Sequence, residues 1–270
     1  MGMNELKTAD IDDFTGAIIY EFDNENRLEI TCTEQFNNAE ELRDALSPSQ
    51  IQLLIYLLYR WREQGGNSIF HVEAKDYFRY RGIKVRKDSK DRFERDLTIL
   101  SALKFQLLVK KKKDDYYVND GLLQFEKVDN GYYEIQFNNW IEHLSQTQYT
   151  LLHKHFFKFH PLYDHYAILL TIKLSQIYKL QLRKKDLSPN IKFYTLCKFL
   201  NIKTEKIKRQ GYENLLKRLQ TVARHLEQCL GFTIHLKYET ESLTQFYDSK
   251  LYYDHPILKK HYQPAEKQCQ

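Results

Sequence analysis

The chain has 270 residues, long enough for one large domain or two of ordinary size, and its 42% hydrophobic and 29% charged residues exclude a disordered protein. Four widely separated cysteines form no C-x-x-C pair, so neither a zinc site nor a disulfide framework is predicted, and no apolar run approaches the length of a membrane span. The net charge is +5, and its segregation between an acidic N-terminal segment and a basic main body favours a polyanionic partner for the main body. The polar, acidic residues 4–15 do not form a signal peptide, so we expect a cytoplasmic protein.

The first 45 residues differ in charge from the rest of the chain. They hold twelve acidic and three basic residues, a net charge of −9, so the other 225 residues carry +14. Within this segment, residues 16–33 predict a β-hairpin, because an apolar run and an alternating one flank turn-forming residues. A short helix is expected over 38–45, and we treat residues 1–45 as an acidic N-terminal β-hairpin extension.

A strong helix start opens the segment that follows. Ser47 can cap the helix, Pro48 suits the first helical position, and Gln50 lies in the register of a capping box. The apolar residues of 49–62 are dense enough to predict the central core helix of a first domain. The elements expected next are a strand over 68–72 and a short helix over 74–81, closed by Gly82.

The stretch from Lys84 to Val118 combines a basic helix with a basic hairpin. Eleven basic residues stand against four acidic ones between Lys84 and Lys113. The apolar stripe that predicts the helix consists of Phe93, Leu97, Leu100 and Leu103. Strands over 105–109 and 116–118 then flank a lysine-rich tip, and a basic helix followed by such a hairpin is typical of a DNA-reading helix and its wing. DNA contacts are therefore expected at Lys84, Arg86, Lys87, Lys90, Arg92, Arg95, Lys111, Lys112 and Lys113.

A second hairpin and a connecting segment complete the first half of the chain. An apolar run, the residues DNG at 129–131 and a returning strand predict a hairpin over 122–137, which we expect to extend the wing sheet. Residues 138–160 are predicted to form connecting helical structure.

The second half repeats this order of elements. The predicted elements are a helix from Pro161 through Leu180, a helix start at Ser188-Pro189 with a short helix over 191–200, a long helix within 203–231 and a strand over 232–238. The apolar stripe of the long helix spans under three heptads and ends in glycine, so a core helix within the domain is favoured over a coiled-coil dimer. Seven basic residues stand against two acidic ones between Lys203 and Arg224. The DNA contacts expected here are Lys203, Lys206, Lys208, Arg209, Lys217 and Arg218.

Together these elements predict an α+β protein with two tandem winged helix-turn-helix domains. The domains are placed at residues 46–145 and 146–250, followed by a C-terminal tail at 251–270 that can pack back. For a single basic helix, a solvated surface and a DNA contact are equally good interpretations. Two such helices at equivalent places of a repeated architecture favour nucleic acid.

A group of histidines raises the alternative of a metal site, including the two-histidine motif of rolling-circle nicking enzymes. That motif needs two histidines flanking one apolar residue on a strand, whereas His153 and His155 flank Lys154 in an expected helix, where side chains two apart diverge. Surface and packing roles are therefore favoured. Because no phosphate-binding glycine loop occurs either, no catalytic residue, metal or other cofactor is predicted. The histidines are His143, His153, His155, His160 and His165.

The order and apolar spacing of these elements resemble the plasmid replication initiator (Rep) proteins, which bind iterons through two tandem winged-helix domains. The matching segments of the first half are LSPSQIQLLIYLLYRW, YFRYRGI and SKDRFERDLTILSALKFQLLV. Those of the second half are HYAILLTIKLSQIY, FYTLCKFLNI and GYENLLKRLQTVARHLEQCLGFTIHLKY. The resemblance covers about residues 46–240, and the acidic residues 1–45 have no counterpart in it.

The resemblance implies a non-enzymatic, sequence-specific protein that binds double-stranded DNA. Such a protein binds repeats at an origin, opens the origin, recruits host helicase and initiator proteins, and represses its own gene as a dimer. By position, Lys203–Arg218 would read the major groove, and the first domain would bind the adjacent groove or the backbone and form the dimer interface. Two alternatives stay open: a winged-helix transcriptional regulator that uses the same surfaces, and a metal-dependent nicking enzyme that uses the histidines.

Overall fold

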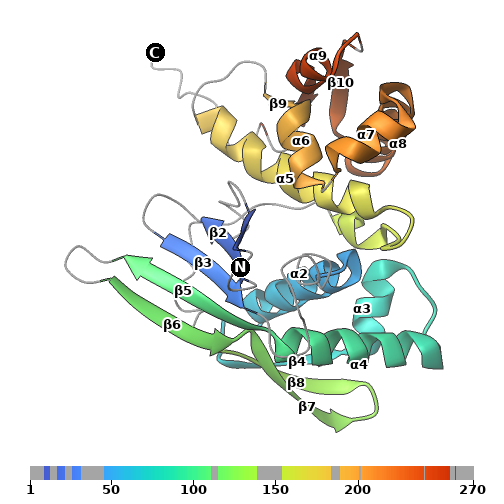
Figure 1. The fold of residues 1–270 in the computed structure, drawn as a ribbon. Coiled ribbons are helices and arrows are strands. Elements are labelled where there is room, and N and C mark those ends of the chain that lie inside the picture. The colour runs from blue at the N-terminus through green and yellow to red at the C-terminus, as the bar shows by residue number, and fades with distance from the viewer. Residues whose placement is uncertain are drawn as a thin grey trace, which may run out of the picture. The chain divides into compact units, whose positions relative to one another are not determined.

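The computed structural model describes residues 9–12, 17–21, 26–31, 46–110, 115–138, 154–183, 189–200, 202–239, 241–255 and 259. The structure is mixed α/β, and the chain divides into two compact units, Met1–Tyr149 and Thr150–Gln270 (Figure 1). Within those residues, no helix combines the length and the apolar character that crossing a bilayer requires.

The core of the first unit consists of helices packed on a small sheet. Its elements are α2 (Pro48–Glu63), β4 (Ile69–Glu73), α3 (Ala74–Arg81), α4 (Lys87–Ala102), β7 (Leu123–Asp129) and β8 (Tyr132–Phe137). The predicted capping box starts α2, because Gln50 N donates to Ser47 Oγ (3.4 Å) and Ser47 N donates to Gln50 Oε1 (2.8 Å). Leu53, Tyr56 and Leu57 are fully buried, which confirms α2 as the core helix.

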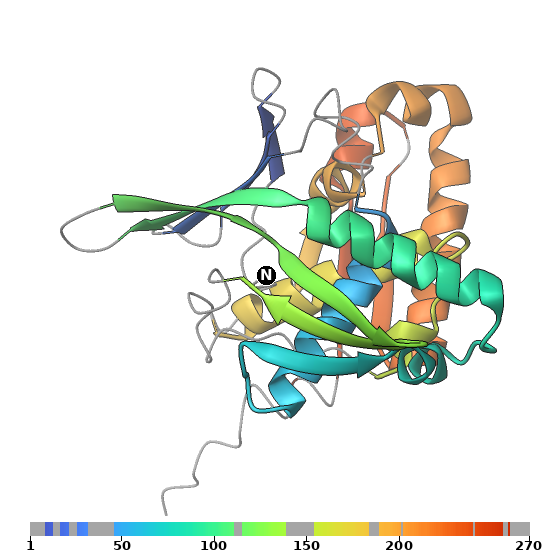
Figure 2. The same ribbon diagram turned by 90° about the horizontal axis from the view of Figure 1, so that it is seen from below.

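The strands of the first unit form two separate sheets. One has the order β4-β8-β7. The other has the order β1-β2-β3-β5-β6 and is built from β1 (Ala9–Asp12), β2 (Ala17–Glu21), β3 (Asn26–Thr31), β5 (Lys104–Lys110) and β6 (Asp115–Gly121). All neighbouring strands in both sheets are antiparallel. Figure 2 shows the long ribbons of β5 and β6 running away from the helices of this unit.

The predicted hairpins are confirmed, but one expectation about them is wrong. β2 pairs with β3 and β5 pairs with β6, as predicted, whereas β1 was not expected. The hairpin of β7 and β8 does not extend the β5–β6 sheet; β8 pairs with β4 instead. The reason lies in the buried faces, since Phe70 of β4 and Phe137 of β8 stack with ring centroids 5.3 Å apart. The predicted helix over 38–45 lies outside the described residues.

The second unit has its own helices and its own sheet. Its elements are the 3-10 helix η2 (Lys154–Lys158), α5 (His165–Arg183), β9 (Asn190–Lys192), α6 (Phe193–Phe199), α7 (Thr204–Gln210), α8 (Tyr212–Leu230), β10 (Thr233–Lys237), α9 (Leu243–Asp248) and β11 (Lys250–Asp254). The antiparallel sheet has the order β10-β11-β9. The apolar stripe of α8 is buried at Leu215, Leu219 and Leu226, so the helix belongs to the core of its own unit, as predicted.

Three boundaries in this unit differ from the prediction. The helix expected from Pro161 begins at His165, and residues 190–192 form a strand rather than the first turn of a helix. Gly211 separates α7 from α8 because its backbone (φ 79°, ψ 150°) leaves the helical region. The segment after 247 does pack back, and β11 becomes the central strand of the sheet, with its Leu251 side chain fully buried.

The two units share one topology. In each, a long helix, a strand, a short helix, a long helix and two strands follow one another, and the last strand takes the central place, in the orders β4-β8-β7 and β9-β11-β10. The first unit adds the β5–β6 hairpin between α4 and β7, and the second unit adds α7 and α9. The repeat predicted from element order therefore extends to the strand pairing.

Candidate nucleic-acid interface

Helix α4 of the first unit is fixed by its apolar stripe and by one buried carboxylate. The predicted stripe residues, Phe93 to Leu103, are all buried. Asp96 lies beside them and accepts hydrogen bonds from Ser49 Oγ (2.7 Å) and Gln50 Nε2 (3.4 Å) at the start of α2. Burial raises the pKa of Asp96, and the two hydrogen bonds oppose that shift. The contact joins the middle of α4 to the first turn of α2.

The neighbouring hairpin also contacts α4. Glu94 accepts hydrogen bonds from Lys127 Nζ of β7 and Tyr133 Oη of β8, both at 2.6 Å, and the Lys127 contact is the main reason that the pKa of Glu94 is lowered. Lys90 Nζ donates to Asn130 Oδ1 in the turn between β7 and β8 (3.3 Å). The hairpin held beside α4 is therefore β7–β8, whereas the sequence interpretation placed the wing at β5–β6.

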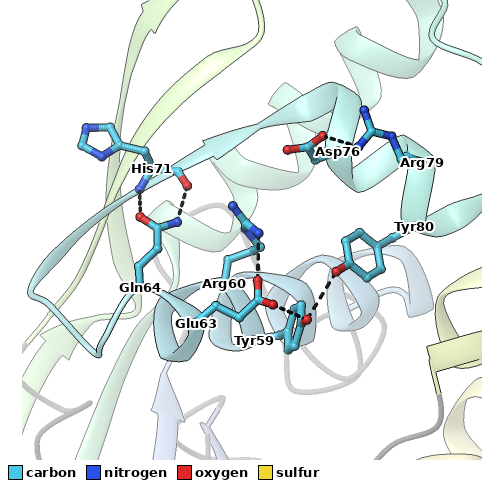
Figure 3. A network of polar contacts seen from close by, with 8 residues as sticks. All are labelled: Tyr59, Arg60, Glu63, Gln64, His71, Asp76, Arg79 and Tyr80. Carbon is cyan, nitrogen blue, oxygen red and sulfur yellow. Dashed lines mark hydrogen bonds and ion pairs between the residues drawn. The ribbon is translucent and has the colours of Figure 1, made fainter.

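A polar network holds the C-terminal end of α2 against α3 and β4 (Figure 3). Tyr59 Oη donates to Glu63 and accepts from Tyr80 Oη of α3 (3.3 Å). The Gln64 side chain donates to His71 O (2.7 Å) and accepts from His71 N (3.1 Å), which extends the network to β4. These contacts join α2 to α3 and to β4 within the first unit.

The predicted DNA-binding residues of the first unit lie on an open surface of mixed charge. Lys90 is half-buried, and the lysine tip at 111–113 lies outside the described residues. Asp88 and Asp91 are exposed among the cations of α4, so the basic surface is interrupted. The exposed cations are Lys84, Arg86, Lys87, Arg92 and Arg95.

The second unit gathers its predicted residues more tightly. A hollow of about 530 Å³ opens where α7 meets α8, lined by Arg209, Gln210, Asn214, Lys217 and Arg218. The break at Gly211 turns α7 away from the axis of α8, so side chains on both helices reach one place. Asn214 Nδ2 donates to Gln210 O (2.6 Å), which closes the junction.

Three of the six predicted contacts of this unit therefore share one site, and the others lie around it. Lys203 and Lys208 are exposed, and half-buried Lys206 lines a smaller neighbouring hollow together with Arg218. Sequence reasoning missed Gln210 and Asn214. One signal in the sequence could have found them. Gln210 and Asn214 lie four residues apart with Gly211 between them, and this spacing places both amide side chains beside the cations.

The chemistry of the hollow suits a nucleic acid. In the described part of the chain, no carboxylate forms an ion pair with Arg209, Lys217 or Arg218, so these cations are available to phosphates. Amide side chains such as Gln210 and Asn214 can donate to and accept from the edge of adenine, and arginine can pair with guanine. The hollow can thus neutralise a phosphate backbone and read base edges.

The histidines have local structural partners. His155 Nδ1 lies 3.1 Å from Cys229 O, and His160 Nδ1 accepts from Leu162 N (3.2 Å). His143 and His153 lie outside the described residues. Among the residues that are described, no group of three or more histidine, cysteine or acidic side chains is arranged to hold a metal ion.

Comparison with known proteins finds similarity of structure and not of sequence. No protein-family model and no curated protein matches the chain. The chain is similar to a crystal structure of domains 2 and 3 of RctB, at 12% identity and a TM-score of 0.55, over 87% of this chain and 89% of that one. A second crystal structure of the same RctB domains matches at 10% identity with the same TM-score, over 91% and 92% of the two chains. At these identities the similarity concerns the fold.

Proposed function

We propose that this chain is a replication initiator that binds repeated double-stranded origin DNA through two winged-helix units and has no enzymatic activity. The observation that carries the proposal is the hollow between α7 and α8, where Arg209, Lys217 and Arg218 lie beside two amide side chains. Cations position a protein on the phosphate backbone, and amides and arginines distinguish bases.

The repeated topology supports the winged-helix assignment. In each unit a short helix precedes a long one, and two further strands pair beside an earlier strand, which is the element order of a winged helix-turn-helix domain. In the first unit we assign the wing to β7–β8, because this hairpin contacts α4. In the second unit α9 replaces a simple wing turn between β10 and β11.

The fold comparison supports an initiator over other DNA-binding proteins. RctB is a replication initiator with winged-helix domains, and its domains 2 and 3 match nearly the whole of this chain in fold. The resemblance to plasmid Rep proteins in element order and apolar spacing favours the same assignment.

The partners follow from this role. A plasmid initiator in the cytoplasm binds origin repeats, recruits host helicase and initiator proteins, and as a homodimer represses its own gene. The second unit would read the major groove at Lys203–Arg218, and the first unit would contact the adjacent groove or backbone through α4.

Replication of an origin-less plasmid tests the proposal. A plasmid that carries this gene and its flanking DNA should replicate in the native host, and a copy with Arg209→Ala and Lys217→Ala should not. If the intact gene fails to support replication while the protein still changes transcription from the flanking DNA, the protein is a winged-helix transcriptional regulator and not an initiator.

A further inference from the structure

The open face of the second unit's sheet carries a row of lysines. Lys250 of the central strand lies directly opposite Lys237 of β10 and Lys192 of β9. The residues next to them in the strands are Ile191 and Leu251, which are buried, and Leu236, which is half-buried, so the lysine side chains lie on the solvent face of the sheet. Lys192 pairs with Asp248 (2.8 Å), whereas no carboxylate in the described ranges forms an ion pair with Lys237 or Lys250.

The open face of the first unit's sheet carries the opposite charge. Glu126 of β7 lies directly opposite Glu134 of the central strand β8. On its other side Glu134 faces His71 of β4, with Oε2 3.5 Å from Nε2. The His71 side chain points away from α2 and α3 in Figure 3, so this row also lies on the solvent face. Asp129 adds a further carboxylate at the end of β7, and Glu73 at the end of β4 forms an ion pair with Lys75.

Both rows place like charges directly across strands, an arrangement that destabilises a sheet. The shared topology does not require like charges to lie across neighbouring strands, because equivalent strands carry lysines in one unit and glutamates in the other. An oppositely charged surface would reduce the repulsion between the like charges of each row. The acidic face of the first unit and the lysine face of the second unit are oppositely charged in this sense.

We propose that copies of this chain associate head to tail, with the acidic face of β4-β8-β7 in one copy against the lysine face of β9-β11-β10 in the next. The occupant is a second copy because the two faces of the chain carry opposite charges, whereas a nucleic acid would explain the lysines alone. Such a contact is heterologous, and the rotation between successive copies decides whether it closes into a ring or continues from copy to copy.

The contact is weak by itself. A face of three short strands covers roughly 200 Å², well below the roughly 800 Å² per partner of a stable interface. It therefore depends on low salt or on a high local concentration. If the chain binds direct repeats as proposed above, neighbouring copies have the same orientation along the DNA, which suits a head-to-tail contact. The inference itself does not need DNA.

Sedimentation of charge-reversed variants tests the proposal without DNA. One variant, Glu126→Lys with Glu134→Lys, makes the acidic face basic, and the other, Lys237→Glu with Lys250→Glu, makes the lysine face acidic. Two controls, Asp88→Lys with Asp91→Lys and Lys158→Glu with Arg224→Glu, make the same charge changes at exposed positions outside both faces.

We expect the average mass of the wild type to rise above that of the monomer with concentration at low salt. Each reversed variant should associate at least about tenfold more weakly than the wild type. An equimolar mixture of the two reversed variants should regain wild-type association. The two control variants should associate as the wild type does. The proposal is overturned if the wild type shows no self-association, if the mixture stays dissociated, or if the controls lose association equally. If the wild type does not associate and only Lys237→Glu with Lys250→Glu weakens DNA binding, the lysine row contacts nucleic acid instead.

Discussion

At the scale of single residues, the cations of the α7–α8 hollow carry the proposed phosphate contacts. Arg209→Ala and Lys217→Ala should each weaken DNA binding, because each removes a charge that displaces counterions from the duplex. The slope of log affinity against log salt should become shallower by about 0.9 for each lost contact. Fluorescence anisotropy over a salt series measures both quantities, with Lys158→Ala on η2 as a control that keeps the wild-type slope. An unchanged slope in Arg209→Ala or Lys217→Ala would remove that residue from the interface.

His255 gives the second unit a dependence on pH. Its ring is buried against Phe232, Nε2 lies 2.9 Å from Leu230 O, and burial lowers its pKa below the ordinary value. Above about pH 6.5, which is the pKa of histidine in the unfolded chain, the neutral ring makes its full contribution to the free energy of unfolding. As the pH falls below this value, the unfolded chain binds the proton more readily than the folded chain, so this contribution is lost.

Urea unfolding between about pH 7 and about pH 5 checks this expectation. His255 should account for a loss of at most about 1.4 kcal/mol per pH unit, which His255→Gln removes. His235→Gln, whose ring is exposed, should retain the wild-type dependence. An identical pH dependence in His255→Gln and the wild type would show that this histidine does not contribute.

At the scale of elements, the bond between Ser49 and Asp96 places α4 on α2. Ser49→Ala should lower the free energy of unfolding by about 1–3 kcal/mol, because a buried carboxylate loses a hydrogen-bond donor. Denaturant titration measures the change. Ser101→Ala near the end of α4 should cost less, since the Ser101 hydroxyl donates to Thr98 O of its own helix and leaves no buried carboxylate without a donor. Equal losses in the two variants would argue against a special role for the Asp96 contact.

Gly211 makes the turn that brings α7 and α8 to one hollow. A Cβ at this position would meet no neighbouring atom, so only the backbone conformation opposes a larger residue. Gly211→Ala should therefore cost about 1–3 kcal/mol of stability and also weaken DNA binding. Gly231→Asn is a matched control, because the left-handed conformation of Gly231 tolerates asparagine. If Gly211→Ala leaves both stability and DNA binding unchanged, the turn does not depend on glycine.

The elements also show what local sequence could and could not predict. Capping residues, apolar stripes and turn residues predicted α2, α3, α4, α8 and six hairpin strands, because these signals act over a few neighbouring positions. Which hairpin joins which sheet depends on contacts between distant residues such as Phe70 and Phe137, and the β7–β8 hairpin was therefore placed in the wrong sheet. The strand at 190–192 was missed because its partner, β11, is about sixty residues away along the chain.

At the scale of the whole molecule, the order of elements predicted the repeat, and the structure extends the repeat to the strand pairing of both sheets. Charge counting found the cations of the α7–α8 hollow, but not Gln210 and Asn214, whose significance depends on the turn at Gly211. The charges on the two sheet faces were not predicted either, since they form rows only once the register of the strands is known.

The central claim, that the second unit reads a duplex sequence, is tested most directly by selection from random duplex DNA. The purified chain should enrich one sequence and bind it at least about a thousandfold more tightly than a scrambled duplex at physiological salt. Gln210→Ala with Asn214→Ala should lose most of that preference while it keeps binding to unselected DNA. Enrichment of no sequence, or a preference that is unchanged in the double variant, would contradict the account.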